Sequence, residues 1–423
     1  MEISLPYGEG AKTIKVPDDN LLDVLRPKEF TVDKTPEQMI KNALDNPQGT
    51  KRIRDIAKKG DTVAIAVDDH TRPCPTHLML PPLLEELSSC GIKNEDTTII
   101  FATGSHRTVK DDEAIRLLGA DIASEINYIS NDCWGEDFTY IGDTSKGTPV
   151  HLKQVFHEAR LKILTGDVEI HYFAGYGGGR KSVLPGVVSY KTIQDNYQRN
   201  FFHPQSRPGV LDGNPMYENM TEAARMSGVD YTINIVQTEK SMIGAYGGHY
   251  DTVLRMGAKL VDQAYRVTTP AKADIVVTAA NGSPHDIDLY QAYKALHLGL
   301  NIVKERGVII LVAECAEGVG NGVGAQNYEK WMKKYKTKKE IQLELEKEFN
   351  IGGHKAYYQL KAMEKAHIIL VTSMPEDEVR ETYRLDYAKT PDEALEKAFE
   401  KKGDKSGVIV LPEGLTTLSA VKK

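Results

Sequence analysis

The chain carries a short apolar run, Leu161-Lys-Ile-Leu164, and soon afterwards the stretch His171-Tyr-Phe-Ala-Gly-Tyr-Gly-Gly-Gly-Arg-Lys-Ser-Val-Leu-Pro-Gly186. The apolar run predicts a buried strand, which places His171 just beyond its carboxyl end, where open α/β sheets bind their ligands. The glycines allow positive φ angles and a close approach of the backbone to a ligand, and Arg180 and Lys181 add two cations beside them. The stretch therefore predicts a site for a phosphate-bearing ligand.

Other interpretations of this stretch stay open. A phosphate loop of the nucleoside triphosphatase type has a glycine immediately before its lysine, whereas Arg180 occupies that position here. The glycines could instead form a turn with a purely structural role. Lys181 has a further possibility, because a lysine amine confined in a glycine loop can anchor a ligand covalently.

Composition limits the class of protein. The 423 residues are enough for two or three domains, and the 40% hydrophobic and 27% charged residues are typical of a globular protein. A net charge of -7 with no basic stripe argues against nucleic-acid binding. The four scattered cysteines indicate reduced thiols, and the pattern predicts neither a signal peptide nor a membrane span, since Met1–Pro6 has no basic or long apolar region and no apolar run is long enough. We therefore expect a cytoplasmic protein whose partners are small molecules or copies of itself.

Unbroken apolar runs predict the strands of parallel sheets, because such strands are buried on both faces. The clearest runs cover residues 62–67, 97–102, 161–164, 273–279 and 308–313. Further strands are predicted at 126–129, 148–152, 231–237, 368–372 and 408–411, a hairpin at 3–16, and helices at 35–44, 51–58, 78–90, 111–118, 190–200, 250–267, 289–303 and, heavily charged, 330–348. The pattern predicts two α/β domains with mostly parallel sheets, residues 1–268 and 269–423, and an active site in the cleft between them.

Polar loops follow three of the strands predicted in the first half. They hold Asp69 and Arg72, His106, and His171 with Lys181. In a doubly wound sheet such loops converge on one crevice. Because histidine titrates near neutral pH, His106 and His171 could act as general base and general acid, although a hydrogen-bonded structural histidine is the alternative for each.

A second group of polar residues lies in the other half of the chain. Tyr290, Gln291 and Lys294 share one face of the predicted helix, which could hold a substrate carboxylate together with Arg72. An ordinary solvated helix face is the other interpretation. His203, followed by proline, is a lone histidine for which a structural or surface role and metal binding are both open.

Four motifs together resemble the lactate racemase family of nickel-dependent 2-hydroxyacid racemases and epimerases, over nearly the whole chain. The motifs are Asp69-His-Thr-Arg-Pro73, Thr103-Gly-Ser-His-Arg107, His171 with Gly178-Gly-Arg-Lys-Ser-Val-Leu-Pro-Gly186, and Tyr290-Gln-Ala-Tyr-Lys294.

The resemblance implies a cofactor and a role for each matching residue. Members of the family use a nickel pincer nucleotide, derived from nicotinic acid and tethered covalently to a lysine, which corresponds to Lys181 here. The implied roles are catalysis by His106 and His171, cofactor binding by Lys181, Asp69, Thr71, Gly177, Gly178, Gly179 and Arg180, and substrate binding by Arg72, Tyr290, Gln291 and Lys294.

The mechanism implied by the resemblance is a hydride shuttle. One histidine removes the hydroxyl proton of a 2-hydroxy acid while the hydrogen on C2 leaves as hydride. The resulting 2-keto acid turns, the hydride returns to its other face, and the second histidine protonates the oxygen. Two histidines are needed because the two enantiomers present their hydroxyl groups to opposite walls of the site.

One position departs from the family pattern. A histidine just past an asparagine ligates nickel in the family, and in this chain Tyr197 follows Asn196. Nickel favours imidazole over a phenol. Either Tyr197 binds the metal, or His203 substitutes, or nickel lacks this protein ligand.

The expected substrate is lactate or a related, larger 2-hydroxy acid, and the expected partners include the enzymes that make the cofactor. Two rival functions stay open. One is a non-catalytic or divergent homologue that only binds the cofactor, and the other is an NTP-dependent enzyme that uses the Gly-rich loop.

Overall fold

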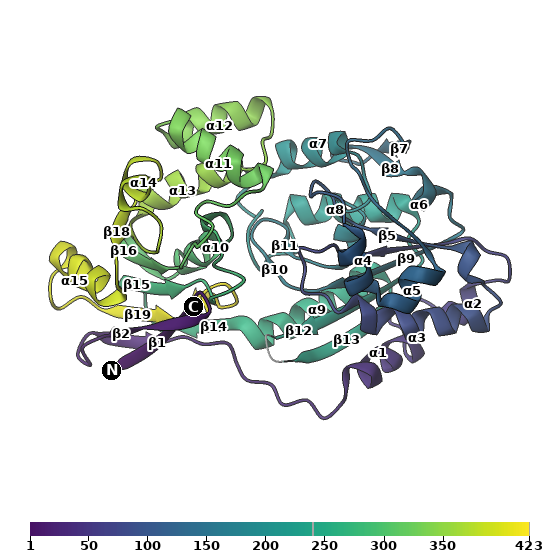
Figure 1. Cartoon of the computed structure of the whole chain (residues 1–423), viewed down its shortest axis with the longest axis horizontal. Coiled ribbons are helices and arrows are strands. Elements are labelled where there is room, and N and C mark those ends of the chain that lie inside the picture. The colour runs from purple at the N-terminus through teal and green to yellow at the C-terminus, as the bar shows by residue number, and fades with distance from the viewer. Residues whose placement is uncertain (239–240, 423) are drawn as a thin grey trace. The chain divides into compact units, whose positions relative to one another are not determined.

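The computed structural model describes residues 1–238 and 241–422 and separates the chain into two compact units. The central unit comprises Phe30–Asp262, and the terminal unit combines Met1–Glu29 with Gln263–Lys423. Both units are α/β folds built on a mainly parallel sheet, as the sequence predicts (Figure 1). The observed division places residues 1–29 with the second half of the chain, whereas the predicted division assigned them to the first.

The central unit is organised around a six-stranded sheet with the strand order β13 (Met242–Gly248), β12 (Tyr231–Gln237), β9 (Leu161–Asp167), β4 (Val63–Val67), β5 (Thr97–Phe101) and β6 (Asn127–Ser130). Neighbouring strands are parallel except at the edge, where β13 is antiparallel to β12. The carboxyl ends of β9, β4 and β5 are therefore adjacent. Every residue of β4 is buried, which explains its unbroken apolar run.

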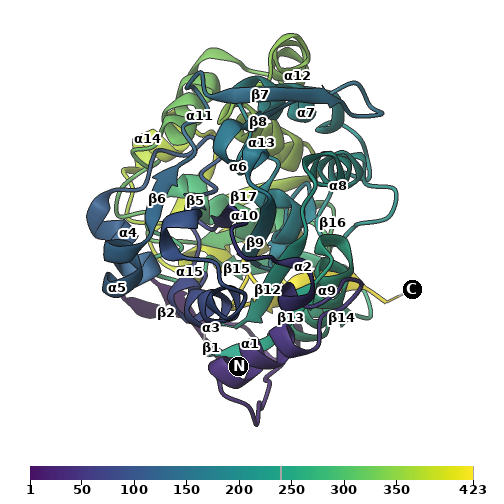
Figure 2. The same cartoon turned by 90° about the vertical axis from the view of Figure 1, so that its right-hand side faces the viewer.

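Helices and short strands complete the central unit, and in Figure 2 α1 lies next to α3 and α4 next to α5. The helix α3 begins at Thr76, two residues before the predicted start, and continues through Pro81 and Pro82. These elements are α1 (Pro36–Asp45), α2 (Ile53–Ile56), α3 (Thr76–Ser89), η1 (Asn94–Asp96), α4 (Asp111–Leu118), α5 (Ala120–Glu125), β7 (Phe138–Asp143), β8 (Pro149–Lys153), α6 (Gln154–Glu158), β10 (Ile170–His171), β11 (Gly175–Tyr176), η2 (Gly179–Ser182), α7 (Tyr190–Asn200), α8 (Pro215–Ser227) and α9 (Tyr250–Tyr265).

The terminal unit has its own six-stranded sheet, in which all neighbouring strands are parallel. The strand order is β18 (Asp386–Ala388), β17 (Ala366–Val371), β16 (Val303–Val312), β15 (Ala273–Ala279), β19 (Val408–Leu411) and β3 (Leu21–Val24). Its other elements are β14 (Arg266–Thr269), paired with β20 (Leu418–Val421), and the helices α10 (Leu289–Gly299), α11 (Val323–Lys334), α12 (Lys338–Lys347), α13 (Gly353–Lys365), α14 (Glu376–Glu381) and α15 (Pro391–Lys402).

The first residues of the chain belong to the terminal unit for a physical reason. β1 (Glu2–Tyr7) and β2 (Gly10–Lys15) form the predicted hairpin, and its buried Ile3, Leu5 and Ile14 share an apolar core with residues of β15 and β19. The next strand, β3, pairs with β19 near the other end of the chain. No local sequence pattern could indicate such a distant partner.

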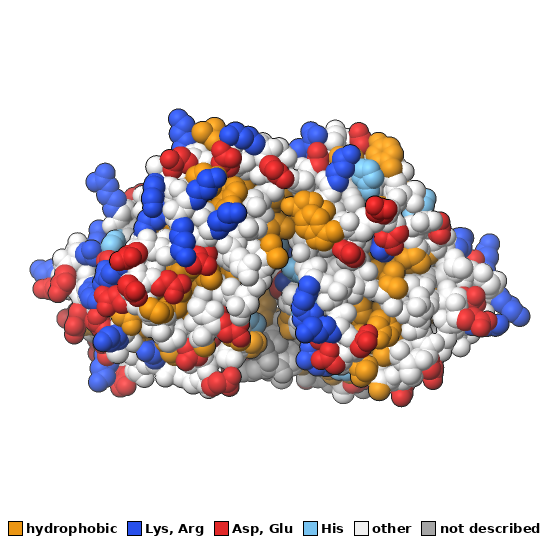
Figure 3. Space-filling model, turned by 45° about the horizontal axis from the view of Figure 1, so that its top comes forward, with side chains coloured by type: hydrophobic (Ala, Val, Ile, Leu, Met, Phe, Trp, Pro, Cys, Tyr) orange, Lys and Arg blue, Asp and Glu red, His pale blue; other side chains and the backbone are white. Residues whose placement is uncertain are grey.

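The surface is mixed in charge. On the face drawn in Figure 3, basic and acidic side chains are interspersed. Within residues 1–238 and 241–422, no helix is long and apolar enough to cross a membrane.

Candidate functional site

The loops after β4, β5 and β9 line one cavity in the central unit. Asp69 and Arg72 come from the first loop, His106 from the second, and Gly177, Gly178 and Lys181 from the third. These loops meet because the three strands are parallel neighbours. A backbone hydrogen bond from the Gly104 amide to the Gly186 carbonyl (3.1 Å) ties the second loop to the third. The structure therefore brings these predicted site residues together.

A buried carboxylate holds His106. Asp69, which is 3% exposed, accepts hydrogen bonds from the amide (2.8 Å) and hydroxyl (2.6 Å) of Thr71, and its Oδ2 lies 2.7 Å from His106 Nδ1. Burial alone would raise the pKa of Asp69, but the hydrogen bond and charge of His106, with Arg72 and Thr71, hold that pKa well below its usual range. Since the ionised carboxylate can only accept, Nδ1 of His106 carries a proton, and Nε2 is its basic nitrogen.

The backbone, in contrast, holds His171. This residue ends β10, which turns back tightly to pair with β11 so that His171 lies opposite Gly175. Its Nδ1 accepts hydrogen bonds from the amides of Phe173 (3.4 Å) and Ala174 (3.2 Å), and its ring stacks on Tyr172. The neutral ring therefore carries its proton on Nε2, the opposite tautomer to His106. Among the described residues, His171 is not one that lines the cavity.

Lys181 is the reactive group of the glycine loop. It lies in η2 and lines the cavity, and burial, followed by the positive charge of Arg72, lowers the pKa of its amine to about 7. An appreciable fraction of the amine is therefore uncharged and nucleophilic near neutral pH. Gly178 makes this turn possible, because its φ is +78° and a Cβ there would lie 3.0 Å from the Asp167 carbonyl oxygen.

Arg180 does not face the cavity. Its side chain is fully buried, and its guanidinium donates to the carbonyls of Ala174 (3.0 Å), Tyr176 (3.1 Å) and Gly178 (3.3 Å). It also lies 4.8 Å from the ring centre of Tyr217. Arg180 therefore holds the glycine loop from inside, and it does not offer this guanidinium to a ligand as the sequence predicted.

Three acidic residues that the sequence analysis did not select also line the cavity: Asp68, Asp167 and Glu169. Glu169 Oε1 lies 3.4 Å from Arg72 Nη1. Burial raises the pKa of Asp68 to about 6, and burial, with the charges of Glu169 and Asp68, raises the pKa of Asp167 well above its usual value. Asp68 directly follows β4, Asp167 ends β9 and Glu169 comes two residues after β9, so the strand-end position that selected Asp69 would also have selected them.

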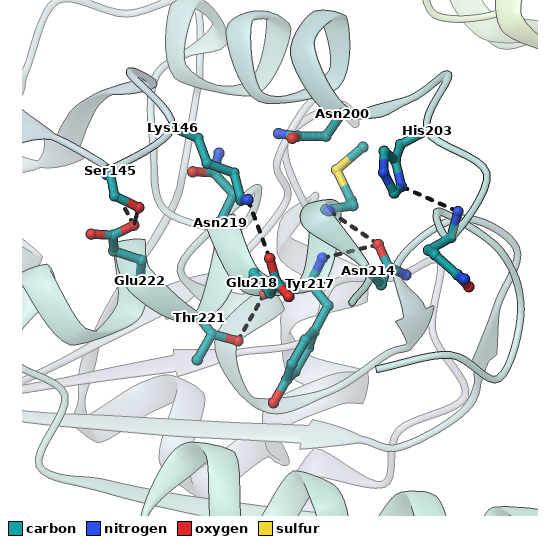
Figure 4. A network of polar contacts seen from close by, with 12 residues as sticks. Ser145, Lys146, Asn200, His203, Asn214, Tyr217, Glu218, Asn219, Thr221 and Glu222 are labelled. Carbon is teal, nitrogen blue, oxygen red and sulfur yellow. Dashed lines mark hydrogen bonds and ion pairs between the residues drawn. The ribbon is translucent and has the colours of Figure 1, made fainter. Parts of the chain in front are cut away.

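The two candidate metal ligands are poorly placed or poorly suited. Burial raises the pKa of the Tyr197 phenol above its ordinary value, so the group is protonated at neutral pH. His203 is exposed, and its Nδ1 accepts the amide hydrogen of Gln205 (3.2 Å) beside Asn214, which caps α8 (Figure 4). In the part of the chain that the structure describes, no three His, Cys, Asp or Glu side chains form a group that could hold a metal ion.

The predicted substrate-binding helix is present in the terminal unit as α10. Asp288 caps this helix by accepting the amide hydrogen of Gln291 (2.7 Å). Tyr290, Gln291 and Lys294 are half-buried on one side of the helix. The Lys355 amine lies 4.3 Å from the ring centre of Tyr290 and donates to its carbonyl.

These features define an α/β protein with a candidate ligand site at the carboxyl edge of a parallel sheet, where a carboxylate-held histidine and a buried lysine line one cavity. The chain belongs to the lactate racemase family, since the Lactate racemase N-terminal domain model matches residues 7–209 and the Lactate racemase C-terminal domain model matches residues 268–419.

Individual relatives agree with this assignment. The chain is 31% identical to lactate racemase of Thermoanaerobacterium thermosaccharolyticum over 425 residues and 32% identical to that of Lactiplantibacillus plantarum over 428 residues, with 98% of each chain covered. It is similar to the solved structure of the T. thermosaccharolyticum lactate racemase apoprotein with a TM-score of 0.91 and 30% identity, over 100% of both chains. A Thermotoga maritima protein shares the fold, with a TM-score of 0.69 and 20% identity, over 93% of this chain and 100% of its own.

Proposed function

We propose that this chain inverts the C2 centre of a 2-hydroxy acid, using a nickel pincer nucleotide tethered to Lys181. One observation carries the proposal: His106, held by Asp69, and Lys181, with its lowered pKa, line the same cavity in a member of the lactate racemase family. A base for the substrate hydroxyl and an anchor for a cofactor are the groups that this reaction needs from the protein.

The cavity has residues that suit the nucleotide part of this cofactor. Lys181 supplies an amine that is partly uncharged at neutral pH, and Gly177 and Gly178 leave room for a ligand because they have no side chains. Arg72 adds a permanent positive charge for an anionic group. When bound, the nickel pincer nucleotide supplies an acceptor for the hydride on C2.

The two histidines carry their ring protons on different nitrogens, and this difference suits the two proton transfers of the reaction. Nε2 of His106 accepts the hydroxyl proton of one enantiomer, because Nδ1 is already engaged with Asp69. Nε2 of His171 carries a proton that it can give to the oxygen on the opposite side. In the reverse direction the two residues exchange these roles.

Arg72, Tyr290, Gln291 and Lys294 remain our candidates for binding the substrate, and Thr71 and Gly179 remain candidates for supporting the cofactor. For Arg72 the support is electrostatic, since this guanidinium lines the cavity, where its Nη1 lies 3.4 Å from Glu169 Oε1. For the residues of α10 the support is the shared helical face and the family resemblance.

The nickel part of the cofactor has less support from the side chains. A protonated phenol at Tyr197 is a poor ligand, and the exposed His203 already uses Nδ1 within its own loop. This observation favours a second candidate function, a divergent homologue that binds the nucleotide through Lys181 without racemising lactate.

The test is a set of chiral 2-hydroxy acids, from lactate to sugar acids, deuterated at C2 and incubated with protein co-produced with the cofactor-biosynthesis enzymes. Hydride transfer predicts that the inverted product keeps its deuterium, because the hydrogen does not exchange with water. Inversion with complete loss of deuterium would contradict the hydride mechanism, and no inversion of any acid would favour the second candidate.

A further inference from the structure

Asp167 stands out among the cavity residues because one of its carboxyl oxygens has no hydrogen-bond partner in the part of the chain that the structure describes. The residue ends β9 and is only 8% exposed. Its Oδ2 accepts a hydrogen bond from the Gln237 side-chain amide (2.8 Å), which also donates to the Pro73 carbonyl (2.9 Å). Its Oδ1 is buried and has no hydrogen-bond partner among the described residues. Burying a polar atom without a hydrogen-bond partner costs free energy, so we expect a ligand to bind this oxygen.

We propose that Asp167 is a ligand-binding residue of this site, which as a neutral carboxylic acid donates a hydrogen bond from Oδ1 to an oxyanion held beside Lys181. The oxyanion is the phosphate of a nucleotide or the carboxylate of the substrate. The inference rests on the proposed function in taking this cavity as the site of the anionic ligand.

The surroundings of Asp167 favour the neutral acid. Burial comes first, and the negative charges of Glu169 and Asp68 add to it, in raising the pKa of Asp167 well above its usual value. The hydrogen bond from Gln237 and the charge of Arg72 act in the opposite direction, but they do not outweigh burial and the two negative charges. With Oδ2 accepting from Gln237, a proton on Oδ1 leaves both oxygens able to be satisfied once an acceptor is bound.

A bound cation is the other way to satisfy Oδ1, and the cavity is less suited to it. The acidic Asp68, Asp69 and Glu169 also line the cavity. Asp69, however, is hydrogen-bonded to His106 and Thr71, and Glu169 Oε1 lies 3.4 Å from Arg72 Nη1. Arg72 and Lys181 repel a cation, the lysine below its pKa near 7. No group of three His, Cys, Asp or Glu side chains within the described residues could hold a metal ion. An acceptor oxygen is therefore the partner that fits.

The test measures binding of inorganic phosphate and of lactate to the full-length apoprotein by calorimetry, with Asp167→Asn and Asp167→Ala. At pH 6 the asparagine, which mimics the neutral acid, should keep the affinity within about twofold, whereas alanine should weaken it about tenfold, the loss of one hydrogen bond. The probe that shows this pattern identifies the group that Asp167 binds. The control is Asp230→Asn, because the Asp230 carboxyl likewise accepts one amide hydrogen bond, from the Lys162 backbone, but precedes β12 at its amino end.

Raising the pH sharpens the test. Anion affinity of the wild type should fall above pH 7, because Lys181 loses its charge. Comparing the wild type with the asparagine variant at each pH cancels the contribution of Lys181 and of the probe, so at any pH at which Asp167 ionises the asparagine variant should bind better than the wild type.

Several results would overturn the inference. They are a wild type that binds neither anion, an asparagine variant as weak as the alanine variant, two variants that bind like the wild type, or nickel ion binding that needs the Asp167 carboxylate. The experiment requires no cofactor, so it is separable from the proposed function. Anion binding with the expected pattern but no adduct on Lys181 would retain this inference and remove the proposed function, and the reverse outcome would do the opposite.

Discussion

The two halves of the site are held together in different ways. In the half formed by the loops after β4 and β5, side chains hold one another, since the Asp69 carboxylate fixes the ring of His106. In the half formed by the loop after β9, the backbone holds the side chains, since amides bind His171 and carbonyls bind Arg180.

This difference predicts which substitutions affect the reaction and which also affect the stability of the fold. A single substitution in the first half removes one polar interaction beside a half-exposed histidine, so it should change the reaction and leave the fold intact. In the second half, the supporting residues also fix the path of the chain, so substitutions there should affect stability as well.

The largest expected effect is the loss of either histidine. His106→Gln and His171→Gln should each lower the racemisation rate of the cofactor-loaded protein by about 10²- to 10⁴-fold, because each removes one of the two proton-transfer groups that we propose. Steady-state kinetics from both enantiomers check this. A near-normal rate for either variant would show that the two halves are not both catalytic.

Asp69→Asn should lower kcat by about 10²-fold, since an amide neither fixes the Nδ1–H tautomer of His106 nor stabilises its cationic form. The thermal midpoint of the apoprotein should change little. The Asp230→Asn variant is the control for loss of a carboxylate from the same sheet. An Asp69→Asn variant that is unfolded would contradict the expectation that substitutions in the first half of the site leave the fold intact.

Arg180→Met should act mainly on stability. It leaves buried carbonyls of the loop without a donor, so the free energy of unfolding should fall by about 2–4 kcal/mol. Chemical denaturation measures this loss, and Arg116→Met, on the exposed side of α4, provides the control. An unchanged stability would mean that the backbone half does not depend on Arg180.

Lys181 should show its lowered pKa in its reactivity. Burial disfavours the ammonium, so the fraction of free amine should increase about tenfold per pH unit up to pH 7 and then level off, whereas ordinary lysines continue to gain reactivity up to about pH 10. Peptide mass spectrometry after brief treatment with a small amine-reactive reagent measures this profile. A midpoint near 10 would remove the electrostatic argument for Lys181 as an anchor.

Thr71→Val should have the smallest effect, about threefold in kcat, because the Asp69 carboxylate loses one hydroxyl donor but keeps the Thr71 amide and His106. A loss as large as that of Asp69→Asn would show that Thr71 takes a direct part in the reaction.

The sequence predicted the sheets best where strands are buried on both faces. β4, β5, β9, β15 and β16 give apolar runs, so their positions could be predicted, as could the meeting of the loops after β4, β5 and β9. The edge strand β13 was not predicted, because its sequence MIGAYGG is rich in glycine. The position of β3 depends on pairing with β19, which local patterns do not encode.

For the site, the residue type and strand-end position predicted Asp69, His106 and Lys181, but not the direction of each side chain. Arg180 and Lys181 are adjacent cations in the same Gly-rich stretch, so the pattern led to the same prediction for both. In the turn of η2, however, the Arg180 guanidinium points into the core. Asp167 was missed although it also ends a strand, and its importance comes from an unpartnered oxygen that only the packing reveals.

The most direct test of the account is the intact mass and nickel content of the protein after co-production with the cofactor-biosynthesis enzymes, compared with Lys181→Ala. The account predicts a covalent adduct with stoichiometric nickel in the wild type and neither in the variant. A wild type with no adduct and no nickel would contradict the cofactor assignment, and an adduct that persists in Lys181→Ala would contradict Lys181 as its anchor.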